Sequence, residues 1–412
     1  SSSVRDISIE VERGNRQRIA EIICIVRRWT WALSAAAALL MLATAPLLSR
    51  WTFGDDNHSL GFIMLSVAVM FNALINCEQS VLQGTRRLRQ LAQVGVCSAT
   101  AGLAVSIPLF YFMRDDGIVL SIIAYSAAAA FFTWKFRNKD YSKTPVSLSV
   151  GEVASRGAGF VRLGFFMTLG SFLSLLSSYI FIAYLNHASG TAAVGHYQAG
   201  YTLIHRYAAL IFTAIGTEYY PRLASVCDSR WRTRLFVSQE INIALTVLVA
   251  IISIFILFRQ LAVNILYSSD FNVIIPFISY ASLGIVFQAI SWCMAYVIIA
   301  KGKGKTYIVT ESLSTITGLT LNVVFYNYAG LDGLGLSYVV WYIFYTLIVG
   351  TVYFRQFKLT LHRSTLIMTL YATVMAAAAI ITMNLGLWPL TTAIAIASVA
   401  VCIISLRKKL SR

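Results

Sequence analysis

Twelve long apolar stretches account for most of this 412-residue sequence. Each is close to the length, about 20 residues at ~1.5 Å per residue, that an α-helix needs to cross a hydrocarbon layer of ~30 Å. Hydrophobic residues make up 58% of the chain and charged residues only 12%, which leaves almost no polar shell for a soluble protein. The pattern predicts an all-α polytopic membrane protein. The approximate spans are 29–48, 60–82, 92–112, 117–134, 163–185, 194–215, 241–258, 273–299, 306–327, 333–354, 364–385 and 388–406.

Basic residues lie almost entirely in every second connection between these spans. Of the 33 Lys and Arg residues, only four lie elsewhere: Arg50, Arg114 and Arg259 in the other connections, and Arg206 inside a span. Short cytoplasmic loops of membrane proteins carry an excess of positive charge, so both chain ends are predicted to be cytoplasmic. The formal net charge of +16 therefore reports topology, and we expect no nucleic-acid partner.

A long-period repeat relates the two parts of the chain. The segment TAGLAVSIPLFYFMRDDGIVLS at 100–121 follows the same course as ITGLTLNVVFYNYAGLDGLGLS at 316–337. Gly102 matches Gly318 and Gly117 matches Gly333, both at an offset of 216 residues. Chance similarity of apolar text is the alternative. Parallel repeats place a substrate site at the interface between the halves.

The repeat also predicts the domain organisation. We expect an N-lobe at 1–150, a C-lobe at 151–358 and an appended helix pair at 359–412. The C-lobe holds six spans and its partner only four, so we expect two further helices before residue 1 and fourteen in the complete protein. A natural variant that lost the first pair is the alternative. A basic, Ser- and Gly-containing linker at 135–159 joins the lobes and would let them rock against each other.

The span 194–215 carries the leading candidate site. Arg206 lies near its middle, where a charged side chain costs at least about 2.5–3.5 kcal/mol and therefore normally faces a bundle interior or a wet cavity. Gln198, Thr202 and His205 lie at i, i+4 and i+7 and share one helical face, which Arg206 borders. A guanidinium binds phosphate through paired donors, and His205 is a possible titrating partner. The alternative is an ion pair between Arg206 and a carboxylate on another span.

Two carboxylates in the spans are the candidates for that alternative. Glu78 and Glu311 each lie about 9–12 Å inside the basic face of the membrane, as judged from the nearest basic loop. Either could be a proton or cation site, as in an antiporter, or a partner for Arg206. Asn76 belongs to an amide-bearing stripe near Glu78; such amides contact a cavity or hold helices together.

Several longer segments resemble the oligosaccharide (O-antigen, Wzx-like) flippases of the MOP exporter superfamily. The resemblance covers nearly the whole chain except the absent first helix pair. The residues that carry it are VGHYQAGYTLI at 194–204, TAIGTEYYPRLASV at 213–226, LYSSDF at 266–271, GIVFQAISWCMAYVIIAKGKGK at 284–305, SSVRDIS at 2–8 and LQGTRRLR at 82–89.

The resemblance implies a MATE-like fold of two lobes around a central cavity. It implies a flippase in the bacterial cytoplasmic (inner) membrane that moves undecaprenyl-diphosphate-linked oligosaccharide by alternating access, for O-antigen (lipopolysaccharide) or capsule synthesis. The partners implied are this lipid-linked oligosaccharide, membrane lipids and the polysaccharide polymerase machinery, and we expect a monomer. A MATE-type drug or metabolite cation antiporter is the main alternative.

We do not expect an enzyme. A polymerase or ligase acting on lipid-linked sugars would carry a large external loop with catalytic groups, whereas the external connections here, such as 186–193, are short and show no nucleophile–base set. An accessory scaffold is the remaining alternative, and the mid-span Arg206 argues against it. The six cysteines are scattered without a CxxC pair or a histidine cluster at ligand spacing, so we expect neither a metal site nor a cofactor.

Overall fold

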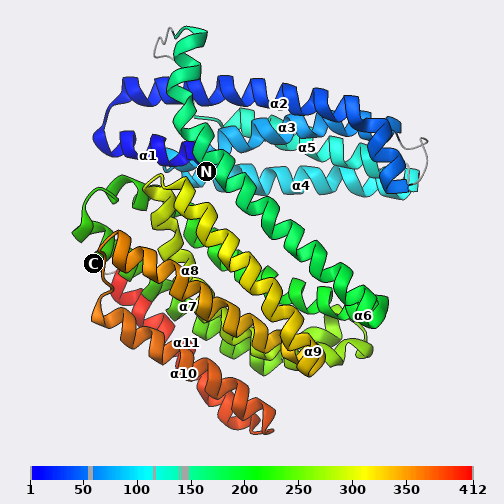
Figure 1. Ribbon diagram of the computed structural model, residues 1–412, viewed down its shortest axis with the longest axis vertical. Helices are drawn as coiled ribbons and strands as arrows, with labels where there is room; N and C mark the ends of the chain where they lie inside the picture. Colours follow the sequence, from blue (N-terminus) through cyan, green and yellow to red (C-terminus); the bar gives the residue numbers. More distant parts are fainter. Residues whose placement is uncertain (1, 54–58, 115–116, 139, 141–147, 411–412) are drawn as a thin grey trace. The chain divides into compact units, whose positions relative to one another are not determined.

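The computed structural model describes residues 2–53, 59–114, 117–138, 140 and 148–410, and this part of the chain is almost entirely helical (Figure 1). The chain divides into two compact units, Ser1–Arg162 and Leu163–Arg412. The division falls inside helix α6, beyond the expected lobe boundary at residue 150. Each unit is described by itself below.

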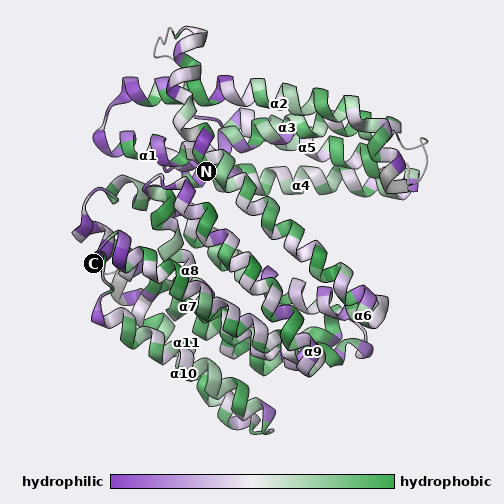
Figure 2. Cartoon of the chain, in the orientation of Figure 1, coloured by the Kyte–Doolittle hydropathy of each residue, from purple (hydrophilic) through white to green (hydrophobic). Residues whose placement is uncertain are grey.

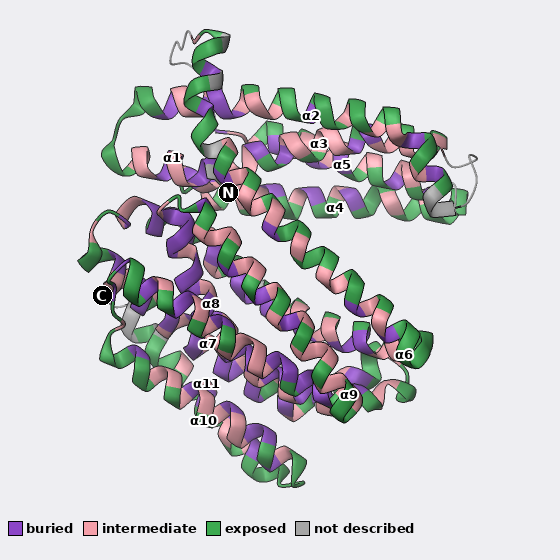
Figure 3. Cartoon of the chain, viewed as in Figure 1, coloured by how far each residue is buried: buried purple, intermediate pink, exposed green. Residues whose placement is uncertain are grey.

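The first unit contains helices that coincide with the first four predicted spans. They are α2 (Arg16–Phe53), α3 (Ser59–Gly84), α4 (Leu88–Met113) and α5 (Gly117–Phe136); the unit also contains α1 (Ser2–Arg13) before them and the start of α6 (Val150–Val226) after them. Helix α2 extends well before the apolar run at 29–48, and α1 lies outside every apolar run. Apolar residues in these helices remain widely exposed (Figures 2 and 3), as expected for surfaces that contact lipid.

Helix α1 is amphipathic and packs its apolar side against α3. Ile7 is fully buried, and the Ser8 hydroxyl donates to the Gly84 carbonyl oxygen at 3.3 Å. A Cβ atom at Gly84 would lie 2.9 Å from the Ile7 Cβ atom, so the close approach depends on glycine at the end of α3. The sequence shows this helix only as a charged segment because its apolar side is narrow.

The second unit is built around α8, most of whose residues are buried (Figure 3). Around α8 lie the rest of α6 and the neighbouring helices. The Thr365 hydroxyl donates to the Ser238 carbonyl oxygen at 3.3 Å, which attaches the last helix pair to α7. The elements are α7 (Arg230–Leu266), η2 (Ser269–Ile274), α8 (Ile275–Ala300), α9 (Gly304–Thr351), η3 (Val352–Gln356), α10 (Arg363–Asn384) and α11 (Trp388–Leu410).

Two of the long helices each contain two of the predicted spans. Within the described residues, ten helices are long and apolar enough to cross a membrane, and those at Val161–Ala209 and Gly304–Gln356 are 49 and 53 residues long. At ~1.5 Å per residue each exceeds twice the ~30 Å needed for one crossing. Both contain non-helical backbone, at Gly190 with φ 80° and at Ala329 and Gly330. Splitting them there confirms the twelve predicted spans.

The 216-residue repeat is visible in the helix limits. Helix α3 (Ser59–Gly84) maps end to end onto α8 (Ile275–Ala300). Helices α4 and α5 map onto the two parts of α9, so that the connection after α4 corresponds to the break at Gly330. Arg114 in that connection and Gly330 both have positive φ, 48° and 58°.

The repeated glycines make repeated contacts. A Cβ atom at Gly102 would lie 2.0 Å from the Tyr125 ring, and one at Gly318 would lie 2.4 Å from the ring of Trp341, the residue 216 positions after Tyr125. Both glycines therefore admit an aromatic ring from the next helix segment. The glycine packing recurs together with the amino-acid sequence. Chance similarity between apolar sequences therefore does not explain the repeat.

Candidate functional site

A polar stripe runs along the part of α6 that follows Gly190. Gln198, Thr202 and Arg206 are exposed, and they lie at i, i+4 and i+8 on one side of the helix. Their apolar neighbours Ile204 and Ala208 are buried inside the second unit. Arg206 thus belongs to the stripe, whereas the sequence pattern placed it only at the border.

His205 lies beside this stripe and is partly buried. Its ring stacks on Tyr201 with centroids 4.5 Å apart, and its Nε2 atom lies 3.5 Å from the Tyr201 hydroxyl. Its Nδ1 atom is buried without a hydrogen-bond partner among the described residues. His205 thus lies at the inner edge of the expected face, and Arg206 is exposed at its outer edge.

Both carboxylates that the sequence offered to Arg206 have other partners. Glu78 pairs with Arg27, and Glu311 accepts a hydrogen bond from the Tyr345 hydroxyl. As far as the second unit is described, no carboxylate lies within ion-pair distance of Arg206. The guanidinium is thus exposed on a membrane-spanning helix with its donors directed to no acidic side chain of its own unit.

Glu311 is half-buried between the two parts of α9 and the first part of α6. A Cβ atom at Gly170 of α6 would lie 3.7 Å from the Glu311 Cβ atom and 3.2 Å from the Tyr307 ring, so α6 approaches closely at this point. The Tyr345 hydroxyl supplies the hydrogen bond that a carboxylate needs away from water. This arrangement leaves further oxygen lone pairs of Glu311 for a proton or a cation.

Hydroxyl and amide groups continue from Glu311 into the centre of the unit. The Tyr345 ring meets the Tyr342 ring edge-on, and the Gln288 amide donates to the Tyr342 hydroxyl at 2.9 Å. The Tyr338 hydroxyl in turn donates to the Gln288 oxygen at 3.1 Å. The second unit therefore contains a connected polar core that joins α8 to both parts of α9.

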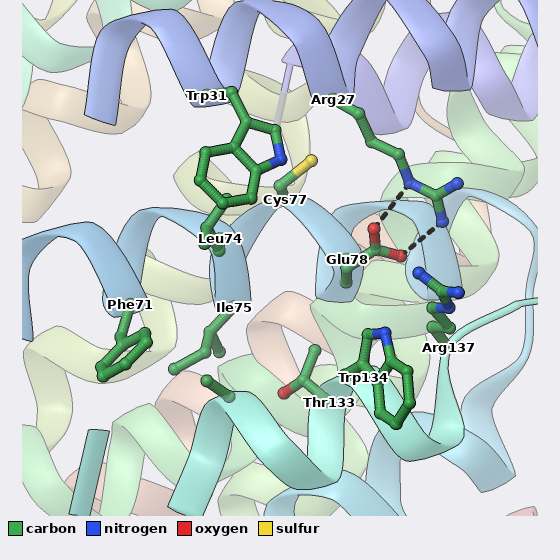
Figure 4. Close-up of a pocket in the computed structure, with 11 residues that line it drawn as sticks. Arg27, Trp31, Phe71, Leu74, Ile75, Cys77, Glu78, Thr133, Trp134 and Arg137 are labelled. Carbon is green, nitrogen blue, oxygen red and sulfur yellow. Dashed lines mark hydrogen bonds and ion pairs between the residues drawn. The ribbon is translucent and has the colours of Figure 1, made fainter. Parts of the chain in front are cut away.

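The first unit contains a separate charged cavity (Figure 4). Arg27 of α2 donates from Nε and Nη2 to the two Glu78 oxygens at 2.6 and 2.8 Å, which is a bidentate ion pair. The pair lies in the wall of a cavity of about 320 Å³ between α2, α3 and α5. Arg137, just after α5, lines the same cavity, and its guanidinium lies 5.4 Å from the Trp134 ring centroid.

Asn76 is exposed on α3, one turn from Asn72. The backbone carbonyl oxygen of Asn76 accepts a hydrogen bond from the Ser80 hydroxyl at 2.7 Å. The neighbouring Asn72 amide donates to the Ser126 hydroxyl of α5 at 3.3 Å. Of the two roles expected for such amides, Asn72 holds helices together, and cavity contact stays a prediction for Asn76.

Three site residues escaped the sequence analysis for different reasons. Arg27 and Arg137 were counted with the basic connections because each lies within two residues of further cations. Arg27 lies inside α2, eleven residues after the helix begins at Arg16, and the apolar run that marked this span begins only at residue 29. Tyr345 lies in an aromatic-rich span, YVVWYIFYTL, where no pattern separates a hydroxyl that binds a carboxylate from one at a membrane interface.

Comparison with known proteins gives a family and a fold. The sequence profile of a family described as "Polysaccharide biosynthesis protein" matches residues 26–276. No curated protein sequence matched the chain.

Solved membrane transporters share the fold. A multidrug resistance MATE family transporter of the MOP superfamily, in an outward-facing conformation, is 12% identical with a TM-score of 0.72, over 87% of this chain and 83% of that one. A MOP superfamily transporter from Pyrococcus furiosus is 16% identical with a TM-score of 0.68, over 87% and 84%. The lipid II flippase MurJ, in an inward closed conformation, is 12% identical with a TM-score of 0.59, over 99% and 90%. At these identities the likeness shows the fold, and it confirms the expected MATE-like, two-lobe class.

Proposed function

The chain belongs to the polysaccharide biosynthesis protein family, and from that membership we propose that it is a flippase for undecaprenyl-diphosphate-linked oligosaccharide. It would move this substrate across the bacterial cytoplasmic membrane for O-antigen or capsule synthesis. Both chain ends would lie in the cytoplasm, as the basic connections indicate. The fold shared with MOP superfamily transporters and with a lipid II flippase supports this proposal.

Arg206 is the single observation that carries the proposal. A lipid diphosphate brings negative charge into a low-dielectric layer, and a fixed guanidinium offsets that charge with paired donors. Gln198 and Thr202 continue the stripe and would hydrogen-bond sugar hydroxyls, and Asn76 of the first unit is a separate candidate for substrate binding. His205, stacked on Tyr201, would support the stripe from behind.

The mechanism we infer is alternating access. The head group enters a cavity open to the cytoplasm, rests against Arg206, and leaves on the other side after the halves rock. The lipid tail stays in the bilayer. The protein contributes binding, orientation and charge compensation, and no bond of the substrate changes.

The test is the leaflet location of lipid-linked sugar in cells that lack the full-length gene. We expect accumulation on the cytoplasmic side, reversed by the intact gene and not by Arg206→Ala. Arg222→Ala, whose parent side chain pairs with Glu218 near the end of α6, is a matched control and should restore transport. Normal folding with normal transport by Arg206→Ala would show that the role given to Arg206 is wrong.

Glu311 favours the second candidate function, a MATE-type cation antiporter. A half-buried carboxylate that accepts one hydroxyl hydrogen bond is suited to exchange a proton for another cation. The same group could couple an ion gradient to the flippase, so it is an ion-coupling candidate under either function. Drug accumulation in cells separates them: an antiporter lowers it in the intact strain and Glu311→Gln abolishes the effect, whereas a dedicated flippase leaves drug accumulation unchanged.

A further inference from the structure

The cavity of the first unit is lined by hydrogen-bond donors that have no acceptor. The Thr133 hydroxyl and the Arg137 Nε atom are both buried, and neither has a hydrogen-bond partner in the part of the chain that the structure describes. Both line the cavity, and Thr133 is only 2% exposed. Buried donors are normally paired, and an unpaired one costs ~1–3 kcal/mol. Two of them in one cavity wall indicate that a missing acceptor belongs there.

The charge of the cavity indicates what kind of acceptor this is. Arg27 and Arg137 are the cations that line it, and Glu78 is the carboxylate. Glu78 binds Arg27 through Nε and Nη2, which leaves the Nη1 donors of Arg27 for another group. One positive charge thus remains uncompensated among the lining residues. An anion with several oxygens satisfies this charge and the unpaired donors together.

The position and the apolar lining indicate a ligand that is part lipid. Glu78 and Thr133 lie in the last turns of α3 and α5, at the ends that lead into basic connections, and Arg137 directly follows α5. The cavity walls also include Trp31 and Trp134, and tryptophan is enriched where hydrocarbon meets head groups. Figure 4 shows Arg27, Glu78 and Arg137 at one end of the cavity and Trp31 and Phe71 at the other. A head group with an attached chain matches this polarity.

We propose that the cavity between α2, α3 and α5 binds the phosphate group of a lipid, held by Arg137, Thr133 and the free side of the Arg27 guanidinium. Glu78 orients Arg27 and limits the charge of the site. Two membrane lipids offer this chemistry, an anionic phospholipid and a polyprenyl diphosphate. This site belongs to the first unit, whereas the Arg206 stripe belongs to the second. The lipid-site proposal therefore does not depend on the proposed substrate path.

The repeat supports a specialised role for this cavity. The positions 216 residues after Glu78, Thr133 and Trp134 are Met294, Val349 and Gly350, and all three are buried and carry no charge. The position 216 residues after Arg137 is Tyr353, a buried residue whose hydroxyl also has no hydrogen-bond partner among the described residues but which carries no guanidinium. The helical frame shared by the two units therefore does not require the charged groups Glu78 and Arg137.

The experiment measures lipid retention on the purified chain by native mass spectrometry. The probes are phosphatidylglycerol, a polyprenyl diphosphate and diacylglycerol, which has no phosphate. We expect retention of the phosphate lipids and not of diacylglycerol. Arg137→Gln and Thr133→Val should each weaken retention by about 10-fold, because each removes a hydrogen bond to a charged group. The tighter of the two phosphate lipids identifies the natural source.

Two further variants keep the test decisive. Arg16→Gln removes an exposed charge at the start of the same helix, α2, and should leave retention unchanged. Glu78→Gln removes the competing carboxylate and should strengthen retention, an outcome that a misfolded variant would not give. Equal retention by the native chain, Arg137→Gln and Thr133→Val would overturn the proposal. So would a loss with Arg16→Gln as large as that with Arg137→Gln, since the effect would then be general surface charge.

Discussion

Helices α3 and α8 have the same length and the same place in the repeat, yet they carry different chemistry. Asn72 of α3 donates to Ser126, and Gln288, its counterpart in α8, donates to Tyr342, the counterpart of Ser126. Six residues further on, Glu78 of α3 corresponds to Met294, which is 2% exposed. Amide contacts that join the helices are thus kept, and the charged group is not.

The same contrast holds in the other direction for α9. Glu311 and Tyr345 correspond to Gly95 and Ala129 of the first unit. Around Gly95 there is open space, since a Cβ atom there would meet nothing within 4 Å. Glu78 and Glu311 therefore each lie where the other unit has an apolar or small residue. Glycine contacts and interhelical amides define the frame that both units share, whereas the charged groups distinguish their roles.

The largest expected effect tests the shared frame at Gly117 and Gly333. A Cβ atom would lie 2.6 Å from the Leu109 carbonyl oxygen in one unit and 2.1 Å from the Phe325 carbonyl oxygen in the other. Backbone cannot yield as a side chain does, so Gly117→Ala and Gly333→Ala should each lower the free energy of unfolding by about 3 kcal/mol. Thermal unfolding in detergent measures this. Gly151→Ala, at a position with open space, is the control. If only one of the two variants is destabilised, the glycine contact stabilises one unit and not the other.

The helical frame could be predicted from the sequence because it depends on residue types with few structural roles. Long apolar runs give membrane spans, and glycines matched at a fixed offset, such as Gly102 and Gly318, mark close approaches. The partners of charged residues were not accessible. Arg27 reads as a loop cation until α2 is seen to begin at Arg16, and nothing in the sequence around Glu311 names Tyr345, which lies 34 residues away.

The direction of side chains on α6 was accessible only in part. The period of 3.6 residues places Gln198, Thr202, His205 and Arg206 within one broad sector of the helix. Which edge of that sector faces the interior depends on neighbours from other helices. In the structure His205 lies at the inner edge, stacked on Tyr201 of the same helix, and Arg206 remains exposed.

An intermediate effect is expected when the first unit is made like the second at Glu78. Glu78→Met leaves Arg27 partly buried without its partner and should cost ~1–3 kcal/mol of unfolding free energy, less than for a fully buried pair because the two side chains are 26% and 16% exposed. Adding Arg27→Leu should restore most of this loss, because a well-packed apolar pair replaces a buried ion pair at little cost. Thermal unfolding of the two single variants and the double variant measures the coupling. If the double variant is as unstable as either single variant, an apolar pair does not replace the ion pair. The ion pair would then be a structural requirement of the first unit.

The smallest expected effect compares the two interhelical amides. Asn72→Leu removes one side-chain contact between α3 and α5, and Gln288→Leu removes the contacts of α8 with Tyr338 and Tyr342. Interhelical hydrogen bonds within membranes contribute ~0.6 kcal/mol on average, so Asn72→Leu should lower the unfolding free energy by about that amount and Gln288→Leu by about twice as much. Unfolding titrations in mixed micelles resolve such differences. Because Gln288 also continues toward Tyr345 and Glu311, its loss should lower transport as well, whereas Asn72→Leu should leave transport near the native level. Equal transport by both variants would show that the polar core of the second unit has only a structural role. The charged groups alone would then distinguish the two units.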